Sequence, residues 1–532
     1  MLTVEQSMSS AVRNLCASLD ADAGFLPVWS AAIDPSSGAV AIRRRWESHN
    51  VGRWWIAVLA AEKAAEIRVP ADLERVMLRN LENVLDEDGL PRFLVPVPRA
   101  GRAAEFARDL KVDWHSLREA LLALVMLAQA RNVPWPARRA QAMIDSLAGS
   151  FDDNLRLDPA MEQEWEGWMS RSIHSPTDPG IGPETVISLG RCLDAMVPAI
   201  SVLRDPSAFL LAARLAAVYA SLVTTRDGSF DDRGAYIHTH SLLLTYSGLV
   251  QFADATRDPT LLATMEKTYQ RTVLPAILPS GFTSHDFGDM RPNRGETTSP
   301  GDCAQLALRL WRLTRRSAYL DDVERIVRSR ILPSQILSSP LRLHFENASV
   351  PPGYEPEDLV LGAFGGMHQH PYGHPLPTTD ITAANVHALS DVCEAAIEED
   401  DAFVRINLHL DRTRPRTTVQ TDRGASQVER SVSVSDTSGK PVLIRVPSWT
   451  RQASVVVTDR TGALLETRTV GDYLAVSQGP GCTEFTLRYP LPRRETHERL
   501  GSDLFTLTWS GDTVVDVRPS APFMPFYPGD MG

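Results

Sequence analysis

The sequence predicts two modules, a helical domain over residues 1–395 and an antiparallel β-sandwich over residues 396–532. Up to about residue 395 apolar residues recur at three- and four-residue spacings, as in Ser116–Asn132 and Phe209–Val223. After Glu399 the pattern changes to short, β-branched, often alternating runs separated by Gly, Pro, Asp and Ser turns, of which 442–449 is a clear case. A chain of 532 residues also exceeds the length over which one hydrophobic core keeps growing.

The helical part contains a recurring junction. Leu203–Pro206, Thr256–Pro259 and Thr314–Ser317 each place arginine and a capping residue between two apolar helical stretches. The recurrence every ~50–60 residues is typical of a repeated helical hairpin, the unit of solenoids and closed α/α toroids. The alternative is that helical hairpins look alike without being repeats.

Composition and net charge limit the kinds of partner and the cellular compartment that we expect for this protein. The net charge of -12 argues against a nucleic-acid partner, which needs clustered Lys and Arg. The five cysteines are far apart without a CxxC pair, and the N-terminus lacks the pattern of a signal peptide. No run approaches the ~20 apolar residues that cross a bilayer. We therefore expect a cytoplasmic protein without nucleic-acid or membrane partners, with a homodimer as an option.

The segment from Ser284 to Trp311 is the strongest candidate for a site, because it combines a Gly/Pro-rich loop with several acids and then enters an apolar helix. Two acids on such a loop can act as general acid and base, or as acid and nucleophile, in glycosidic cleavage. A cysteine in the first turn of a helix can have a lowered pKa and act as a nucleophile. Alternatively, Asp302 caps the helix and Cys303 packs as a small apolar residue. The predicted catalytic residues are Asp302, Cys303, Glu296 and Asp286.

Other candidates come from histidines and tryptophan. His238 and His240 lie where a loop meets a helix and are predicted to bind sugar hydroxyls, although capping roles are as plausible. His285 belongs to the acidic loop. His370 lies in a loop with three histidines, which we interpret as pocket-lining in preference to metal-binding. Trp54 is predicted to stack on a sugar ring, and the alternative is that it packs in the hydrophobic core.

Several motifs resemble glycoside hydrolase family 127, the β-L-arabinofuranosidases. Trp46–Trp54 resembles its WxSDVxKW segment, His238–Ser241 its HAN motif, Asp302–Ala304 its ETCA helix, and Val442–Trp449 its LRLRIPGW strand. The resemblance covers nearly the whole chain and implies an (α/α)6 toroid followed by β-sandwich modules. It also implies a retaining enzyme.

In that family a Cys nucleophile lies beside a zinc ion held by further Cys ligands and a Glu, and Cys303 matches the nucleophile. The family Glu corresponds to Gly301, and its Cys-Cys pair to Ile381 and Thr382. Zinc needs about four ligands. We therefore predict no metal and no cofactor, with zinc implied only by the resemblance.

The predicted function is that of a glycoside hydrolase acting on a small-molecule glycoside, with chemistry altered from the family. Asp286, Glu296 and Asp302 would supply acid and base or nucleophile. Two alternatives remain open: a carbohydrate-binding or regulatory protein without turnover, and a toroid lyase or natural-product tailoring enzyme acting on a non-sugar.

Overall fold

The computed structural model describes residues 2–33, 39–43, 48–97, 105–151, 182–230, 237–337, 344–345, 356–366, 370–374, 376–422, 429–436, 439–476 and 484–527. Among them, six helices pack side by side in a closed ring. These inner helices are α2 (Ser48–Ala65), α4 (Leu117–Ala130), α7 (Leu189–Leu203), α9 (Thr239–Thr256), α12 (Thr298–Thr314) and α14 (Thr379–Ala396).

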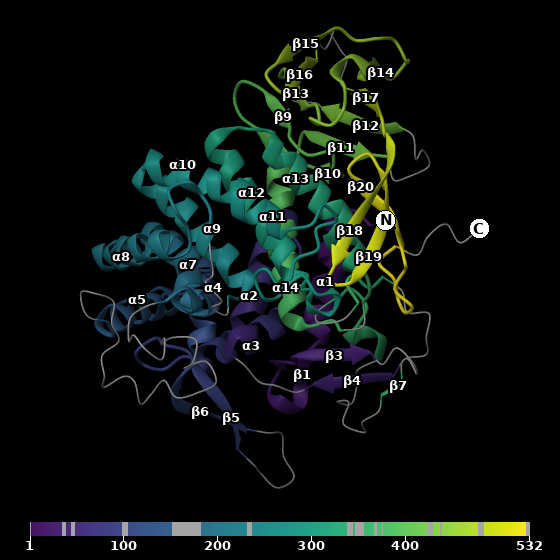
Figure 1. Ribbon diagram of the computed structural model, residues 1–532. Coiled ribbons are helices and arrows are strands. Elements are labelled where there is room, and N and C mark those ends of the chain that lie inside the picture. The colour runs from purple at the N-terminus through teal and green to yellow at the C-terminus, as the bar shows by residue number, and fades with distance from the viewer. Residues whose placement is uncertain are drawn as a thin grey trace.

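A second layer of helices surrounds the ring. Each outer helix follows its inner partner in the chain, except that the N-terminal helix packs against α14 and so completes the layer. The outer helices are α1 (Val4–Ala17), α3 (Ala71–Val84), α5 (Trp135–Gly149), α8 (Pro206–Leu222), α10 (Pro259–Thr268) and α13 (Ala318–Ile326). The predicted (α/α)6 toroid is confirmed, and Figure 1 shows this helical part in purple to green.

The recurring junctions are the turns that lead from inner to outer helices. Arg204, Arg257 and Arg315 end α7, α9 and α12 in the left-handed conformation, with φ of 55°, 54° and 57°. At two of these junctions the next helix is capped by an aspartate, Asp205 or Asp258, whose side chain accepts backbone N–H groups. The same short turn is therefore repeated around the ring.

The connections at the other end of the ring are much longer. The chain returns from each outer helix to the start of the next inner helix over segments such as 85–116 and 277–297, whereas inner-to-outer turns such as 204–205 span a few residues. The long connections carry small sheets that the helical period did not predict. These are β3 (Ser30–Ile33), β4 (Ala39–Arg43) and β7 (His344–Phe345), and the hairpin of β5 (Arg92–Val97) and β6 (Glu105–Val112). Loops that could carry function thus lie at the N-terminal ends of the inner helices.

The C-terminal strands form two five-stranded sheets. One has the order β10 (Arg412–Thr413), β11 (Thr417–Thr421), β12 (Glu429–Asp436), β17 (Glu484–Pro490) and β14 (Val456–Asp459). The other has the order β15 (Thr467–Val470), β16 (Tyr473–Val476), β13 (Val442–Arg445), β9 (Val404–Ile406) and β8 (Ile397–Glu399). Pairing is antiparallel apart from β9 with β13, which run parallel.

A third, three-stranded sheet returns to the helical ring. It consists of β18 (Arg493–Leu500), β19 (Asp503–Ser510) and β20 (Thr513–Arg518), drawn in yellow beside the helices in Figure 1. Glu498 accepts hydrogen bonds from the Ser280 backbone and hydroxyl, both at 2.7 Å, and from Tyr372 at 2.6 Å. The last strands therefore fix the loop that leads into α12.

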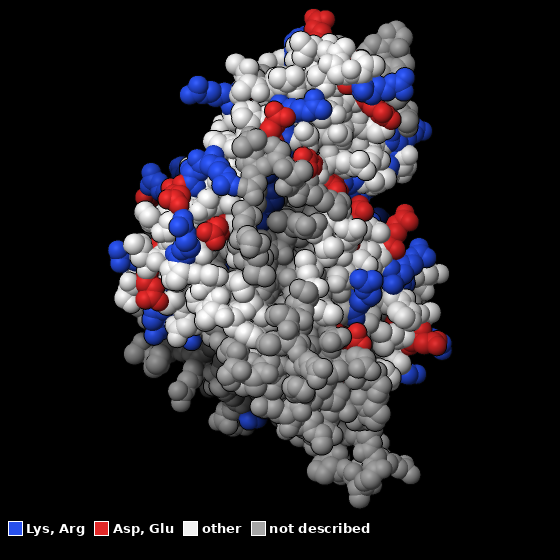
Figure 2. All heavy atoms as spheres, turned by 90° about the vertical axis from the view of Figure 1, so that its right-hand side faces the viewer, with Lys and Arg blue, Asp and Glu red and all other residues white. Residues whose placement is uncertain are grey.

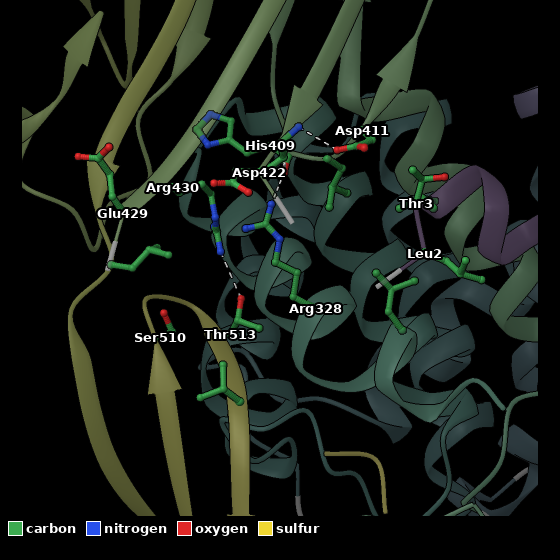
Figure 3. Close-up of a pocket in the computed structure, with 16 residues that line it drawn as sticks. Leu2, Thr3, Arg328, His409, Asp411, Asp422, Glu429, Arg430, Ser510 and Thr513 are labelled. Atoms are coloured by element: carbon green, nitrogen blue, oxygen red, sulfur yellow. Dashed lines mark hydrogen bonds between the residues drawn. The ribbon is translucent and has the colours of Figure 1, made fainter. Parts of the chain in front are cut away.

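A cavity of about 200 Å³ lies where α1, the sandwich and the third sheet meet (Figure 3). Arg328 and Arg430 line it, and both pair with Asp512, at 3.3 and 2.9 Å. The charges at this junction join the modules to one another.

On the face drawn in Figure 2, acidic and basic side chains of the described residues are interspersed.

Within the part of the chain that the structure describes, one helical stretch, Thr185–Leu203, is long and apolar enough to span a membrane by length and composition, contrary to the expectation that no run approaches that length. It contains α7, an inner helix of the ring, and 72% of its apolar window is buried in the protein. Arg191 and Asp194, both buried, lie within it. These features are those of a core helix.

Candidate active site

The N-terminal ends of the inner helices converge on a cluster of polar side chains. Each helix contributes at least one charged or titratable residue near its start, and nearly all of them are buried. The cluster consists of His49 and Arg53 (α2), Glu119 (α4), Arg191 (α7), His240 (α9), Asp302 (α12) and Asp380 (α14). Asp380 is the most accessible, with 14% of its side chain exposed.

Asp302 is joined to the cluster through His240. Its Oδ2 lies 2.5 Å from Nδ1 of His240, and Nε2 of the same ring pairs with Arg53. Burial raises the pKa of Asp302 well above its usual range, and the nearby Glu296 adds to the rise, although Arg53 and Arg118 oppose it. Burial lowers the pKa of His240 well below its usual range, and Arg53 adds to that effect. Both shifts favour a protonated Asp302 beside a neutral His240.

Asp380 has the opposite ionisation. Its Oδ1 lies 2.8 Å from Nε2 of His49 and 2.8 Å from Nε of Arg53. Burial opposes ionisation, but Arg53 and His49 overcome it and lower the pKa of Asp380 far below its usual range. In turn, Glu119 and Asp380 outweigh the burial of His49 and raise its pKa to about 9. Asp380 is therefore a carboxylate held by two cations.

Glu119 is the anion at the centre of the cluster. It pairs with Arg191, with Arg53 at 3.4 Å and with His49 at 3.2 Å. Burial would raise the pKa of Glu119, but these cations hold it well below its usual range. Gly52 allows the close approach of α2 to α4, since a Cβ there would meet the Glu119 backbone at 2.7 Å.

A second group comes from the loop before α12 and from the start of α9. His238 Nε2 lies 3.3 Å from Oε2 of Glu296, and the rings of His238 and His285 are 4.6 Å apart. His285 Nδ1 lies 2.5 Å from Oδ1 of Asp286, whose other oxygen pairs with Arg294. Burial would raise the pKa of Asp286, but Arg294 and His285 lower it. Among the described residues, His238, His285 and Glu296 are the group that could hold a metal ion.

The structure thus brings six of the predicted residues together and leaves three elsewhere. Cys303 is fully buried beside Tyr269, with 4.0 Å between Sγ and Oη, and burial raises the pKa of its thiol far above its usual range. Trp54 is fully buried and packs edge-on against Trp55. His370 contacts Tyr372 and Phe505 near the third sheet. Some further candidates lie outside the described residues. These are three tryptophans that could stack on sugars and two loop segments: Trp46, Trp165, Trp168, 231–236 and 367–369.

The residues present do not fit the thiolate-bound zinc that the family resemblance implies. Gly301 has no side chain, and a Cβ there would lie 3.0 Å from Ala388 and 3.3 Å from Asn385. Ile381 and Thr382 offer no thiolate, and Thr382 donates its hydroxyl to the backbone of its own helix. The thiol of Cys303 faces Tyr269 on the outer layer.

His49, Arg53, Glu119, Arg191 and Asp380 were not singled out from the sequence. Each is a charged or titratable residue near the start of a long apolar helix, as Arg118-Glu119 is in Leu117–Ala130. Such residues are usually solvent-exposed helix ends. The signal in the sequence was that all six inner helices, which are similar in length, repeat the feature.

Known proteins share this fold. No protein-family model matches the sequence, and a search of curated proteins finds no similar sequence. A solved β-arabinofuranosidase of glycoside hydrolase family 127 matches 87% of this chain and 74% of its own, at 13% identity and a TM-score of 0.56. A family-127 β-L-arabinofuranosidase from Geobacillus stearothermophilus T6 matches 95% of this chain and 80% of its own, at 12% identity and a TM-score of 0.53. The chain has the fold of these glycoside hydrolases.

A further solved structure matches a smaller part of this chain. A sugar epimerase from a ruminal bacterium matches 74% of this chain and 99% of its own length, at 10% identity and a TM-score of 0.50. Fold likeness at such identities leaves the reaction to be argued from the site.

Proposed function

We propose that the protein is a glycoside hydrolase acting on a small glycoside, with Asp302 as the proton donor and Asp380 as the opposing carboxylate. The observation that carries this proposal is that two carboxyl groups of one cluster have different partners: Asp302 contacts a histidine, whereas Asp380 contacts a histidine and an arginine. Their pKa values are shifted in opposite directions, that of Asp302 upward and that of Asp380 downward. Glycoside hydrolysis needs such a pair, one to protonate the leaving oxygen and one to act as base or nucleophile. The fold likeness to glycoside hydrolases supports it.

The hydrogen bonds around His240 assign the proton of the donor. Arg53 has only N–H donors, so Nε2 of His240 accepts from it. The neutral ring therefore carries its proton on Nδ1, which donates to Oδ2 of Asp302. The acidic proton of Asp302 is then on Oδ1, the oxygen left for the substrate. His240 orients the acid instead of binding sugar hydroxyls, because both of its nitrogens are engaged.

Asp380 would face the sugar from the accessible side of the cluster. His49 and Arg53 fix its orientation and keep it ionised. It would either activate a water or attack the anomeric carbon, the two roles open to the second carboxylate of a glycosidase. The partly exposed side chains of His285, Asp286 and Arg294 offer donors and acceptors for sugar hydroxyls. L-arabinofuranosides are the first substrates to test, because of the fold likeness.

The test is a hydrolysis screen with nitrophenyl glycosides, led by L-arabinofuranosides, on the full chain and two variants. Asp302→Asn and Asp380→Asn should each lower kcat/KM by at least ~100-fold, the lower bound for losing one acid–base residue. Asp391→Asn is the matched control. Asp391 is a partly buried carboxylate of α14, but it lines a cavity of about 230 Å³ where Gln251 and Arg309, from the C-terminal parts of α9 and α12, also lie. Wild-type activity in either test variant would remove that residue from the mechanism.

A second candidate function is sugar binding without turnover. It is favoured by the position of Cys303, which is not among the cluster residues, so the thiolate chemistry implied by the resemblance has no counterpart. A folded protein that binds sugars in calorimetry but hydrolyses none of the glycosides would support this function over hydrolysis.

A further inference from the structure

His238, His285 and Glu296 each place one ligand atom within 4.8 Å of the other two. The three residues come from two segments of chain, the start of α9 and the loop between Ala276 and Thr298. All three are buried or partly buried. Two imidazoles and one carboxylate are a ligand set that proteins use for divalent transition metals.

Backbone hydrogen bonds hold these residues in place before any ligand arrives. The Thr239 N–H donates to His285 C=O at 2.9 Å, and the His285 N–H donates to Arg294 C=O at 2.7 Å. The Glu296 N–H donates to Thr283 C=O at 3.0 Å. The loop is therefore a small cross-bridged structure against the start of α9, and side chains that are already held in place favour binding of a ligand.

Each imidazole also has an orienting partner on Nδ1. His238 Nδ1 lies 2.9 Å from the Ser241 hydroxyl, and His285 Nδ1 lies 2.5 Å from the Asp286 carboxylate. Metal-bound histidines usually have such a partner, which fixes the tautomer and leaves Nε2 as the coordinating atom. The His285–Asp286 pair has the carboxylate–histidine arrangement seen at zinc sites.

Glu296 supplies a buried anionic acceptor. Only 2% of the residue is exposed, and its Oε2 has no hydrogen-bond partner among the described residues. This oxygen lies 3.3 Å from Nε2 of His238, at ion-pair distance. A buried acceptor that lacks a well-formed hydrogen bond costs up to about 1–3 kcal/mol. A cation between Glu296 and the two histidines would satisfy it.

We propose that His238, His285 and Glu296 bind one divalent transition metal ion of the zinc type through two imidazole nitrogens and one carboxylate oxygen. Three protein ligands leave coordination positions open for water or a hydroxyl oxygen of a ligand. The site shares no residue with the thiolate set implied by the family resemblance. It stands on these three side chains and does not depend on the proposed hydrolysis.

The test uses the full chain, stripped with a chelator and titrated with Zn²⁺ by calorimetry. The wild type should bind one equivalent, and Glu296→Gln and His285→Gln should each weaken binding by at least ~100-fold. Asp286→Asn should weaken it by ~10–100-fold, the usual effect of losing a partner of a metal-bound histidine. His497→Gln, at an exposed histidine of β18, is the control and should bind like the wild type.

Co²⁺ provides a second measurement on the unaltered protein. Its absorption spectrum should show ligand-field bands of nitrogen and oxygen ligands without the intense thiolate charge-transfer band that a Cys303 site would give. Circular dichroism checks the fold of each variant. Absence of stoichiometric binding by the folded wild type, or binding that persists in both ligand variants, would overturn the site. A thiolate band would place the metal at a cysteine and would overturn it as well.

Discussion

Asp302 and Cys303 are neighbours in α12, yet their side chains face opposite sides of the wall of the ring. Asp302 faces inward and pairs with His240 of α9, whereas Cys303 faces outward and contacts Tyr269, next to α10. A step of one residue turns a helix by about 100°, so one helix can present an acid to the cluster and a thiol to the core. The hypothesis of a carboxylate nucleophile and the hypothesis of a thiol nucleophile therefore depend on side chains that face different sides of the ring.

Asp302→Asn should change the dependence of stability on pH. The folded-state pKa of Asp302 is raised, so its contribution to stability is fully present below the unfolded pKa of about 3.9 and is lost as pH rises through the folded value. The wild type should lose about 1.4 kcal/mol per pH unit in that interval relative to the variant. Chemical unfolding at pH 4, 5, 6 and 7 checks this.

An asparagine can keep the hydrogen bond to His240 and carries no charge at any of these pH values. The variant should therefore gain stability over the wild type as pH rises, while losing turnover. A constant difference between the two proteins from pH 4 to 7 would show that Asp302 is not protonated in the folded state.

Cys303→Ala should leave hydrolysis at the wild-type rate. The thiol is fully buried among core side chains and its pKa is raised by burial, so it is neither accessible nor ionised. The free energy of unfolding should fall by about 1 kcal/mol because of the small cavity left behind. Cys393→Ala, at a buried cysteine of α14, is the matched control and should behave alike. Loss of turnover in the Cys303 variant alone, with an intact fold, would restore the thiol nucleophile.

A repeated helical hairpin could be predicted from the sequence because its turns repeat, whereas closure into a toroid was implied only by the family resemblance. Arg204, Arg257 and Arg315 end three inner helices in the same left-handed conformation, and this local repetition is visible in the residues themselves. The strands β3 to β6 were not predicted, because the alternation of apolar and polar residues in a short strand is too brief to be distinguished from the helical pattern on either side.

The site could be predicted only in part, because periodicity does not say which side of a helix faces the axis. On α12, Asp302, Gln305 and Arg309 form a polar stripe, and such a stripe is normally expected to face solvent. Gln305 instead donates to Asp391 at 2.7 Å, and Arg309 pairs with Asp194 at 3.2 Å, both inside the ring. Closure of the ring, a long-range property, turns a polar stripe into an interior lining.

His49 should stabilise the protein at neutral pH and lose that effect in alkali. Its folded pKa is raised from 6.5 to about 9, so its contribution is fully present below pH 6.5 and is lost as pH rises through about 9. The contribution is about 3 kcal/mol from the shift of the pKa. Unfolding at pH 6.5, 8 and 10 should show this loss in the wild type but not in His49→Gln.

His387→Gln is the matched control for His49. It is a buried histidine of α14 whose pKa burial lowers to about 4, so its removal should leave the alkaline slope unchanged. Equal alkaline slopes in the wild type and the His49 variant would mean that His49 is neutral in the folded protein.

Asp194→Asn should destabilise the protein more than any surface charge change. Asp194 is buried and pairs with Arg118 at 2.7 Å and Arg309 at 3.2 Å, and it accepts from Ser247 at 2.8 Å. Removing one partner of a buried ion pair costs about 3–5 kcal/mol, although Arg118 keeps a second carboxylate, Glu119, at 3.2 Å. Asp72→Asn, which removes an exposed partner of Arg75, is the control and should change the free energy of unfolding little. Equal stability of the two variants would mean that Glu119, and not Asp194, compensates Arg118 inside the ring.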